Sequence, residues 1–150
     1  MRAVIQRVTE ASVRVDGTVT GSIGVGFLVL LGVTGGDTPR HAAVMAAKIA
    51  KLRVFRDEHD RMNLALADVG GAVLVVSQFT LYADCSHGNR PSFTSAAPPQ
   101  QANELYELFC RELAACGPRV EKGVFGADMD VRIANQGPVT ICIDSADLRI

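Results

Sequence analysis

Polar side chains follow an apolar run in the middle of the chain, in the stretch from Gly71 to Leu81. The run is rich in β-branched residues and too short for a helix, so it predicts a buried strand. Ser77, Gln78 and Thr80 then bring hydroxyl and amide groups to the end of that strand. Two-residue alternation places Phe79 on the opposite face. A rigid element that ends in such groups can hold a substrate.

The hydroxyl groups of Ser77 and Thr80 raise the question of covalent catalysis. A hydroxyl nucleophile needs a base within hydrogen-bond reach. None of the three histidines, His41, His59 and His87, lies near the strand in sequence, although spatial proximity stays open. The G-x-S-x-G elbow is also absent. We therefore favour hydrogen bonding or oxyanion stabilisation over nucleophilic attack, with ordinary polarity at a strand end as the third interpretation.

A second polar stretch, Asn135 to Thr140, lies between two apolar runs and contains Gly137-Pro138. Proline inside a strand removes a ladder donor, so it belongs at an edge or a break. A cis bond here would direct two neighbouring carbonyl oxygens in similar directions, where they could accept hydrogen bonds from an ammonium group. Gly137 has no Cβ to obstruct a ligand. From the residues alone, an ordinary trans turn remains the alternative.

Length and charge limit the classes of protein and partner. The 150 residues predict a single domain, 1–150, large enough for a real core. The formal net charge is -1 and no long block of like charges occurs. This excludes the broad basic surface of a phosphate-neutralising protein, so any RNA partner is expected to bind over a small footprint.

Cysteine and histidine spacing favours neither a metal site nor a redox motif. The four cysteines form no C-x-x-C pair and the histidines form no HExxH pattern, so we expect free thiols, no metal and no cofactor. No apolar run is long enough to span a membrane. Met1 to Arg7 resembles a first strand rather than a signal peptide, which predicts a cytoplasmic protein.

Several strands and two long helices are expected around these stretches. Asp16-Gly17 between two alternating runs predicts a tight hairpin. The expected strands are 4–15, 18–23, 27–33, 54–55, 71–81, 120–125, 129–134 and 139–143, and the expected helices are 40–52 and 100–116, with a loop over 82–99. The fold class is therefore α+β, with two substantial helices against a mixed, largely antiparallel sheet or open barrel.

Four motifs, in this order and spacing, resemble the D-aminoacyl-tRNA deacylase family. They are Ser77 to Leu81, Gly88 to Phe93, Gly123 to Met129, and Asn135 to Thr140. The likeness covers the whole chain, including its opening residues. Members of that family are homodimers that hydrolyse the ester joining a D-amino acid, or glycine, to the 3′-terminal adenosine of tRNA.

The resemblance implies a role for each matching residue. The terminal adenosine and the ester would lie against Ser77, Gln78, Phe79 and Thr80. The other implied site residues are Phe125 as a pocket wall, Gly137 and Pro138 as a Gly-cisPro motif inserted into the partner subunit's pocket, and Arg7 as the support of that motif. His87 departs from the family pattern, which has a lysine before Gly88.

The residues and the resemblance together suggest a mechanism. Rigid carbonyl oxygens would anchor the ammonium group and exclude an L side chain, while glycine would enter. Water would attack the ester with help from the ribose 2′-hydroxyl, and backbone N–H groups near Phe79 and Thr80 would stabilise the oxyanion. The alternatives are attack by Thr80, an editing domain of relaxed chirality with a trans Gly-Pro, and a non-catalytic module that binds aminoacylated ends.

Overall fold

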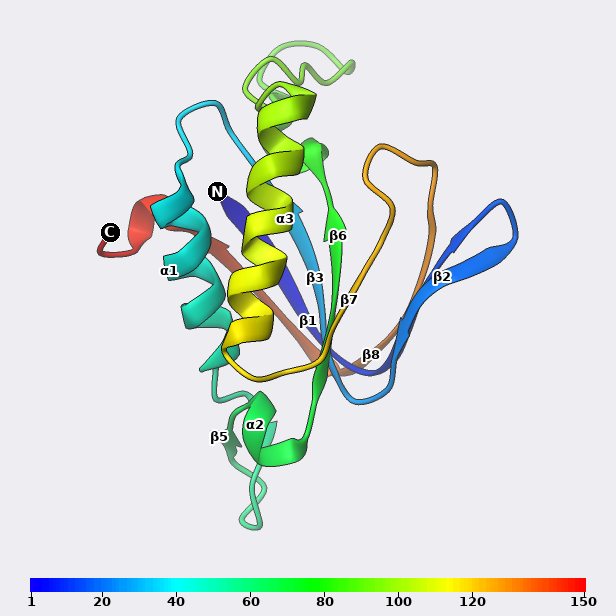
Figure 1. The fold of residues 1–150 in the computed structure, drawn as a ribbon, viewed down its shortest axis with the longest axis vertical. Coiled ribbons are helices and arrows are strands. Elements are labelled where there is room, and N and C mark those ends of the chain that lie inside the picture. The colour runs from blue at the N-terminus through cyan, green and yellow to red at the C-terminus, as the bar shows by residue number, and fades with distance from the viewer.

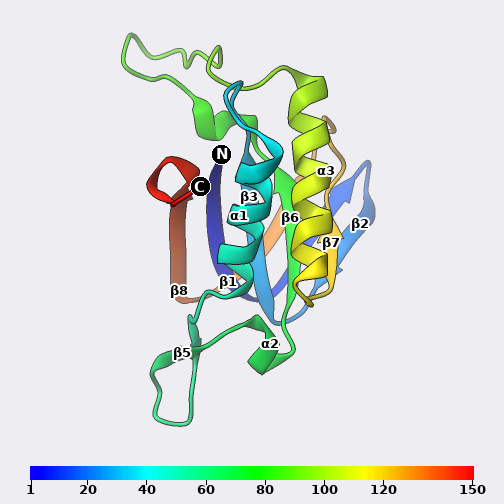
Figure 2. The same ribbon diagram turned by 60° about the vertical axis from the view of Figure 1, so that its left-hand side comes forward.

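The computed structural model describes residues 1–150 and shows a curved six-stranded sheet with the two long helices on one face, and a separate two-stranded sheet (Figures 1 and 2). Its elements are β1 (Arg2–Val15), β2 (Thr18–Ile23), β3 (Gly26–Gly32), α1 (Pro39–Ala50), β4 (Phe55–Arg56), β5 (Met62–Leu64), α2 (Leu66–Val69), β6 (Ala72–Ser77), the 3-10 turn η1 (Phe79–Tyr82), α3 (Pro99–Ala115), β7 (Val120–Lys122), β8 (Asp130–Asp144) and the 3-10 turn η2 (Ser145–Asp147).

Strand β1 is the centre of the sheet. The strand order is β2-β1-β3-β6-β7, and β8 pairs with the other side of β1. The pairings of β1 with β2, β3 and β8 are antiparallel, whereas β3–β6 and β6–β7 are parallel. The α+β class and the mixed, barrel-like sheet are confirmed. The parallel part was not anticipated, and it requires the crossovers that contain α1 and α3.

Two clusters of buried apolar side chains pack against the sheet, one on each face. The larger one joins α1 and α3 to the sheet, and Phe27 stacks on Phe55 within it at 5.1 Å between ring centroids. The smaller one fills the concave face, where the β1–β2 hairpin curls over β6. Gly21 allows this approach, because a Cβ there would lie 2.7 Å from the Lys122 carbonyl oxygen. The sheet is therefore a nearly closed barrel.

Predictions from local sequence patterns were correct for the hairpin and for the two long helices. Asp16 and Gly17 have positive φ angles, as a tight hairpin turn requires, so the predicted hairpin is confirmed. The two long helices begin and end within two residues of their predicted bounds. Thr38 is the N-cap of α1, and its hydroxyl lies 2.8 Å from His41 Nδ1.

The strand predicted over 71–81 ends earlier than expected, at Ser77. Residues Phe79–Tyr82 form the 3-10 turn η1, so strand alternation does not place Phe79. This turn packs directly on Gly32, where a Cβ would lie 3.0 Å from Leu81 Cβ and 3.1 Å from the Gln78 carbonyl oxygen. A contact with a distant glycine, which no local pattern contains, therefore ends the strand.

The two strands predicted on either side of Gly137-Pro138 form one strand, β8, which runs from Asp130 to Asp144. The predicted interruption does appear in the pairing with β1, because Gln6 pairs with Thr140 and Val8 pairs with Asn135, so Gly137-Pro138 lies in the unpaired segment between these pairs. The Asn135 amide donates hydrogen bonds to the carbonyl oxygens of Arg7 and Val139, each at 3.0 Å. This side chain replaces ladder hydrogen bonds that the irregular segment cannot make.

We expect Gly26→Ala to destabilise the fold by about 3 kcal/mol or more. Gly26 has φ +154, and a Cβ there would lie 1.7 Å from the Ala72 carbonyl oxygen, so β3 and β6 would have to separate. Gly36→Ala is the matched control, because a Cβ at Gly36 meets nothing within 4 Å. Urea unfolding followed by circular dichroism measures both, and equal midpoints would contradict the role of Gly26.

Candidate active site

A cavity of about 720 Å³ opens beyond the end of β6. It lies between η1, the segment before α3, the first turn of α3 and the β7–β8 connection. Most of its lining is apolar. The lining residues are Val33, Val76, Ser77, Gln78, Phe79, Phe93, Thr94, Ala96, Ala97, Pro98, Pro99, Ala102, Phe125, Gly126, Ala127, Met129 and Val131.

The structure brings together Ser77, Gln78, Phe79 and Phe125 of the predicted site residues, all in this lining. Thr80 is exposed on η1 beside the cavity but outside its lining. The Gln78 amide donates a hydrogen bond to the Thr80 hydroxyl. Thr80 therefore belongs to the rim, where its contact is an amide rather than a base.

Two exposed aromatic rings form one side of the cavity. Phe79 is 55% exposed and Phe93 is 37% exposed, and their ring centroids are 5.1 Å apart in an edge-on arrangement. Exposed rings of this kind offer a flat apolar surface on which a nucleic-acid base can stack. Phe93 was not among the predicted site residues. Its only sequence signal was its place at the end of the Gly88 to Phe93 motif.

The opposite wall is anchored in the core. Phe125 packs on Tyr106 with 6.1 Å between ring centroids, and the Tyr106 hydroxyl donates a 2.8 Å hydrogen bond to the Val75 carbonyl oxygen of β6. Burial is the main cause that raises the pKa of Tyr106, so this phenol stays protonated and keeps its bond. Tyr106 thereby fixes Phe125 relative to the strand that carries Ser77.

No acid or base lines the cavity. Its lining contains no Asp, Glu, His, Cys, Lys, Arg or Tyr side chain. Its polar side chains are Ser77, Gln78 and Thr94. Nowhere in the chain do three or more His, Cys, Asp or Glu side chains gather in a way that could hold a metal ion. The cavity lining can therefore act on a substrate through hydrogen bonds, through main-chain dipoles and through its shape.

Gly137 and Pro138 lie outside the cavity of their own chain and are exposed. The peptide bond between them is cis, so the ordinary trans turn is wrong. The Arg7 guanidinium supports this segment, because its Nε donates to the Gln136 carbonyl oxygen at 3.3 Å. Its Nη1 donates to the Val54 carbonyl oxygen at 2.6 Å.

Arg7 is only 3% exposed. Burial, followed by the nearby charge of Arg56, lowers the pKa of the Arg7 guanidinium, although arginine remains charged at neutral pH. Two main-chain acceptors therefore surround a buried cation under the exposed turn. The cation fixes the turn from below and leaves its outer side free.

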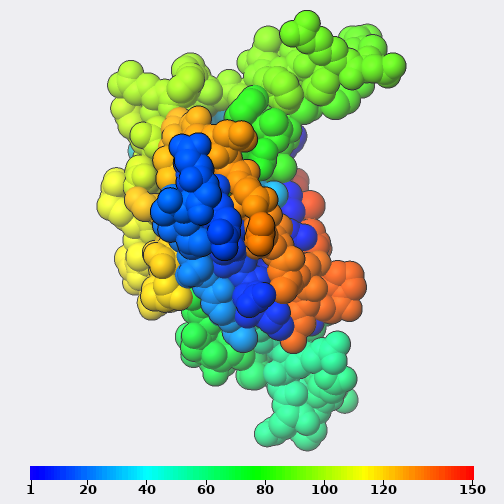
Figure 3. Space-filling view, turned by 90° about the vertical axis from the view of Figure 1, so that its right-hand side faces the viewer, coloured from blue at the N-terminus to red at the C-terminus, as the bar shows by residue number.

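The loop between η1 and α3 projects from the body of the molecule (Figure 3). Main-chain hydrogen bonds between Asp84 and Ser92 close it at 2.7 and 2.9 Å. His87 is exposed within this closed loop and makes no side-chain hydrogen bond there. The structure therefore does not bring His87 to the cavity.

None of the helices has the length and the apolar character that crossing a membrane requires.

Comparisons with known proteins agree along the whole chain. The family model described as D-Tyr-tRNA(Tyr) deacylase matches residues 4–144. A D-aminoacyl-tRNA deacylase of Anaeromyxobacter dehalogenans is 60% identical over 148 residues, which are 99% of each chain. One from Thermus aquaticus is 59% identical over 147 residues, covering 98% of this chain and 97% of the relative.

Two solved structures share the fold. The c-Myc DNA Unwinding Element Binding Protein superposes with a TM-score of 0.90 at 43% identity, covering 96% of this chain and 98% of that one. A probable eukaryotic D-amino acid tRNA deacylase superposes with a TM-score of 0.81 at 16% identity, covering 95% and 97%. The second likeness concerns the fold alone. The chain therefore belongs to the D-aminoacyl-tRNA deacylase family and is a hydrolase.

Proposed function

We propose that the protein hydrolyses the ester bond of D-aminoacyl-tRNA and glycyl-tRNA in the cavity at the end of β6, releasing the amino acid and tRNA. The observation that carries this proposal is the lining of that cavity. It combines an exposed aromatic pair with the hydroxyl of Ser77 and the amide of Gln78, and it contains no acid or base. Such a site suits a substrate with a planar base, a polar ester and reactivity of its own.

Phe79 and Phe93 are assigned to the terminal adenine, which would stack on their exposed rings. The ester would then lie toward Ser77 and Gln78. The first N–H groups of a helical turn have no partner within the turn, and η1 begins at Phe79. The N–H groups of Phe79 and Thr80 can therefore stabilise the oxyanion that forms on the ester carbonyl.

Hydrolysis would proceed by attack of water on the ester carbonyl, assisted by the 2′-hydroxyl of the terminal ribose. The bond from the carbonyl carbon to the 3′-oxygen breaks, and that oxygen leaves with a proton as the ribose hydroxyl. A base-free lining supports this scheme over attack by Thr80, whose hydroxyl contacts only the Gln78 amide. Family membership favours hydrolysis over a non-catalytic binding module.

Chiral selection is assigned to Gly137 and Pro138 of a second protomer. These residues are exposed, supported from below by Arg7, and absent from the cavity lining of their own chain. In a homodimer they would project into the partner's cavity and place main-chain oxygens against the substrate. A main-chain wall cannot rotate away, so an L side chain would clash while glycine and D-amino acids enter.

Replacing the terminal 2′-hydroxyl of D-tyrosyl-tRNA by hydrogen should slow hydrolysis at least about a hundredfold, the typical contribution of a positioned proton-transfer group. Thr80→Val should retain most of the activity on the normal substrate. Single-turnover release of labelled D-tyrosine measures both rates. Normal hydrolysis of the deoxy-ended substrate, together with an inactive Thr80→Val, would instead establish Thr80 as the nucleophile.

Gly137→Ala should weaken chiral selection. The added Cβ would lie 3.0 Å from Arg7 Nη2 and from Val139 Cγ2, at a φ of +121, so the turn must move. We expect the L-to-D rate ratio to rise at least about tenfold, which corresponds to a loss of about 1.4 kcal/mol of discrimination. Gly17→Ala is the control: it also has a positive φ, +79, but a Cβ there meets nothing within 4 Å. An unchanged ratio for Gly137→Ala would count against this role.

Sharing of residues between protomers can be tested by complementation. Co-expression of Phe79→Ala and Gly137→Ala chains with different tags gives mixed dimers with one unaltered cavity facing one unaltered turn. If Phe79→Ala inactivates its own cavity, random pairing leaves about half of the active cavities facing an unaltered turn, so the L-to-D rate ratio should fall to about half that of the Gly137→Ala dimer. A ratio equal to that of the Gly137→Ala dimer would mean that each protomer uses its own turn.

A further inference from the structure

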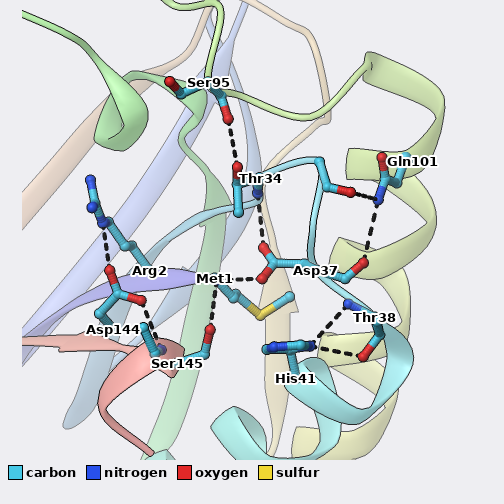
Figure 4. Close-up of polar contacts among 12 residues, drawn as sticks. Met1, Arg2, Thr34, Asp37, Thr38, His41, Ser95, Gln101, Asp144 and Ser145 are labelled. Atoms are coloured by element: carbon cyan, nitrogen blue, oxygen red, sulfur yellow. Dashed lines mark hydrogen bonds and ion pairs between the residues drawn. The ribbon is translucent and has the colours of Figure 1, made fainter.

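A second buried charge lies at the start of the chain. Only three polar or charged residues are buried, namely Arg7, Asp37 and Ser145. The α-ammonium group of Met1 lies 2.5 Å from Asp37 Oδ1 and donates a 2.7 Å hydrogen bond to Ser145 Oγ (Figure 4). Asp37 and the ammonium group thus neutralise each other out of solvent.

The other oxygen of Asp37 connects this ion pair to the cavity. Asp37 Oδ2 accepts a hydrogen bond from the Thr34 N–H at 2.8 Å. The Thr34 hydroxyl donates to the Ser95 carbonyl oxygen at 2.6 Å, and the Ala97 N–H donates to the Val33 carbonyl oxygen at 2.9 Å. Figure 4 shows the path from Met1 through Asp37 and Thr34 to Ser95.

The same loop also holds the first turn of α3. The Gln101 amide donates to the Gly35 carbonyl oxygen at 3.0 Å and to the Asp37 carbonyl oxygen at 3.3 Å. Residues on both sides of Gln101, among them Pro98 and Ala102, line the cavity. The loop 33–37 therefore supports both the segment before α3 and the helix itself.

The cavity wall at 93–98 has little else to hold it. Ala97 is its one buried residue, at 9% exposure. Its remaining hydrogen bonds reach only nearby positions in the chain, such as Ala96 N–H to the Phe93 carbonyl oxygen at 3.1 Å and Ala102 N–H to the Pro98 carbonyl oxygen at 2.9 Å. The position of this wall relative to the sheet therefore depends mainly on Val33 and Thr34.

We propose that Asp37 is a positioning residue of the deacylase. The contact with the Met1 nitrogen holds its carboxylate in place, the carboxylate fixes Thr34, and Thr34 fixes the wall that bears Phe93 and Thr94. This inference rests on the proposed function, because it takes the cavity as the substrate site.

Loss of the charge of Asp37 would leave the buried group that it faces without its anion, which is strongly unfavourable. Residue 37 would then be displaced, and its bond to the Thr34 N–H would be lost.

The test compares Asp37→Asn with Glu121→Gln. Glu121 on β7 is a carboxylate that pairs with Arg119 at 2.9 Å and is not part of the cavity lining. Kinetics with D-tyrosyl-tRNA are measured well below the unfolding midpoint. We expect Asp37→Asn to raise KM about tenfold, with kcat per folded molecule within about twofold of wild type. Glu121→Gln should leave both unchanged. A lower unfolding midpoint with unchanged KM would overturn the proposal, because it would show a structural role alone.

Two further measurements separate positioning from general stability. Thr34→Val removes the hydroxyl bond to Ser95 and should raise KM, whereas Thr34→Ser keeps that bond and should restore it. Hydrogen exchange of the Ala97 amide should accelerate in Asp37→Asn and Thr34→Val and remain slow in Thr34→Ser. Equal KM values for the valine and serine variants would overturn the assigned path.

Phe79→Ala separates this inference from the proposed function. If Phe79→Ala is fully active, the cavity is not the site and the proposed function fails. If Phe79→Ala is inactive while Asp37→Asn has a normal KM, only the inference about Asp37 fails.

Discussion

A charge that leaves water must find partners within the protein, and this constraint governs both parts of the candidate site. The chain buries two charged side chains, Arg7 and Asp37. Arg7 lies under the exposed Gly137–Pro138 turn, and Asp37 lies under the wall of the cavity. Both are connected to β1, since Arg7 belongs to it and Asp37 binds the ammonium group just before it. The most extensively paired strand of the sheet is thus the reference from which both parts are positioned.

Buried ion pairs and buried cations are poor sources of net stability, because desolvation offsets most of the attraction. Apolar residues could have filled the same space with little loss. What a buried charge does provide is direction, since each hydrogen bond fixes an angle as well as a distance. Arg7 binds two carbonyl oxygens from segments far apart in sequence, at Val54 and Gln136. These buried charges are therefore better explained by the geometry that their hydrogen bonds fix than by any gain in stability.

The sequence predicted what is encoded locally. Asp16-Gly17 forces its hairpin through backbone conformation alone, and the amphipathic helices follow from apolar spacing. The predicted residues Ser77, Gln78, Phe79 and Phe125 do meet in one cavity. The errors concern interactions across the sheet. The end of β6 depends on Gly32, and the continuity of β8 past Gly137-Pro138 depends on the Asn135 amide. Met1 and Asp37 are 36 residues apart in sequence, and no periodicity links them.

The support under Gly137 and Pro138 has a further consequence for how the site is assembled. An exposed turn gains little stability from being rigid, because water can satisfy its carbonyl oxygens in many conformations. Here a buried guanidinium, the Asn135 amide and the pairing of β8 with β1 all restrict a turn that covers no cavity of its own chain. A turn that is held rigid without stabilising its own chain is expected where its exposed side must contact another molecule. In the proposed homodimer, a ligand held by the second protomer would meet that condition, because it would require main-chain oxygens in a fixed position before the substrate arrives.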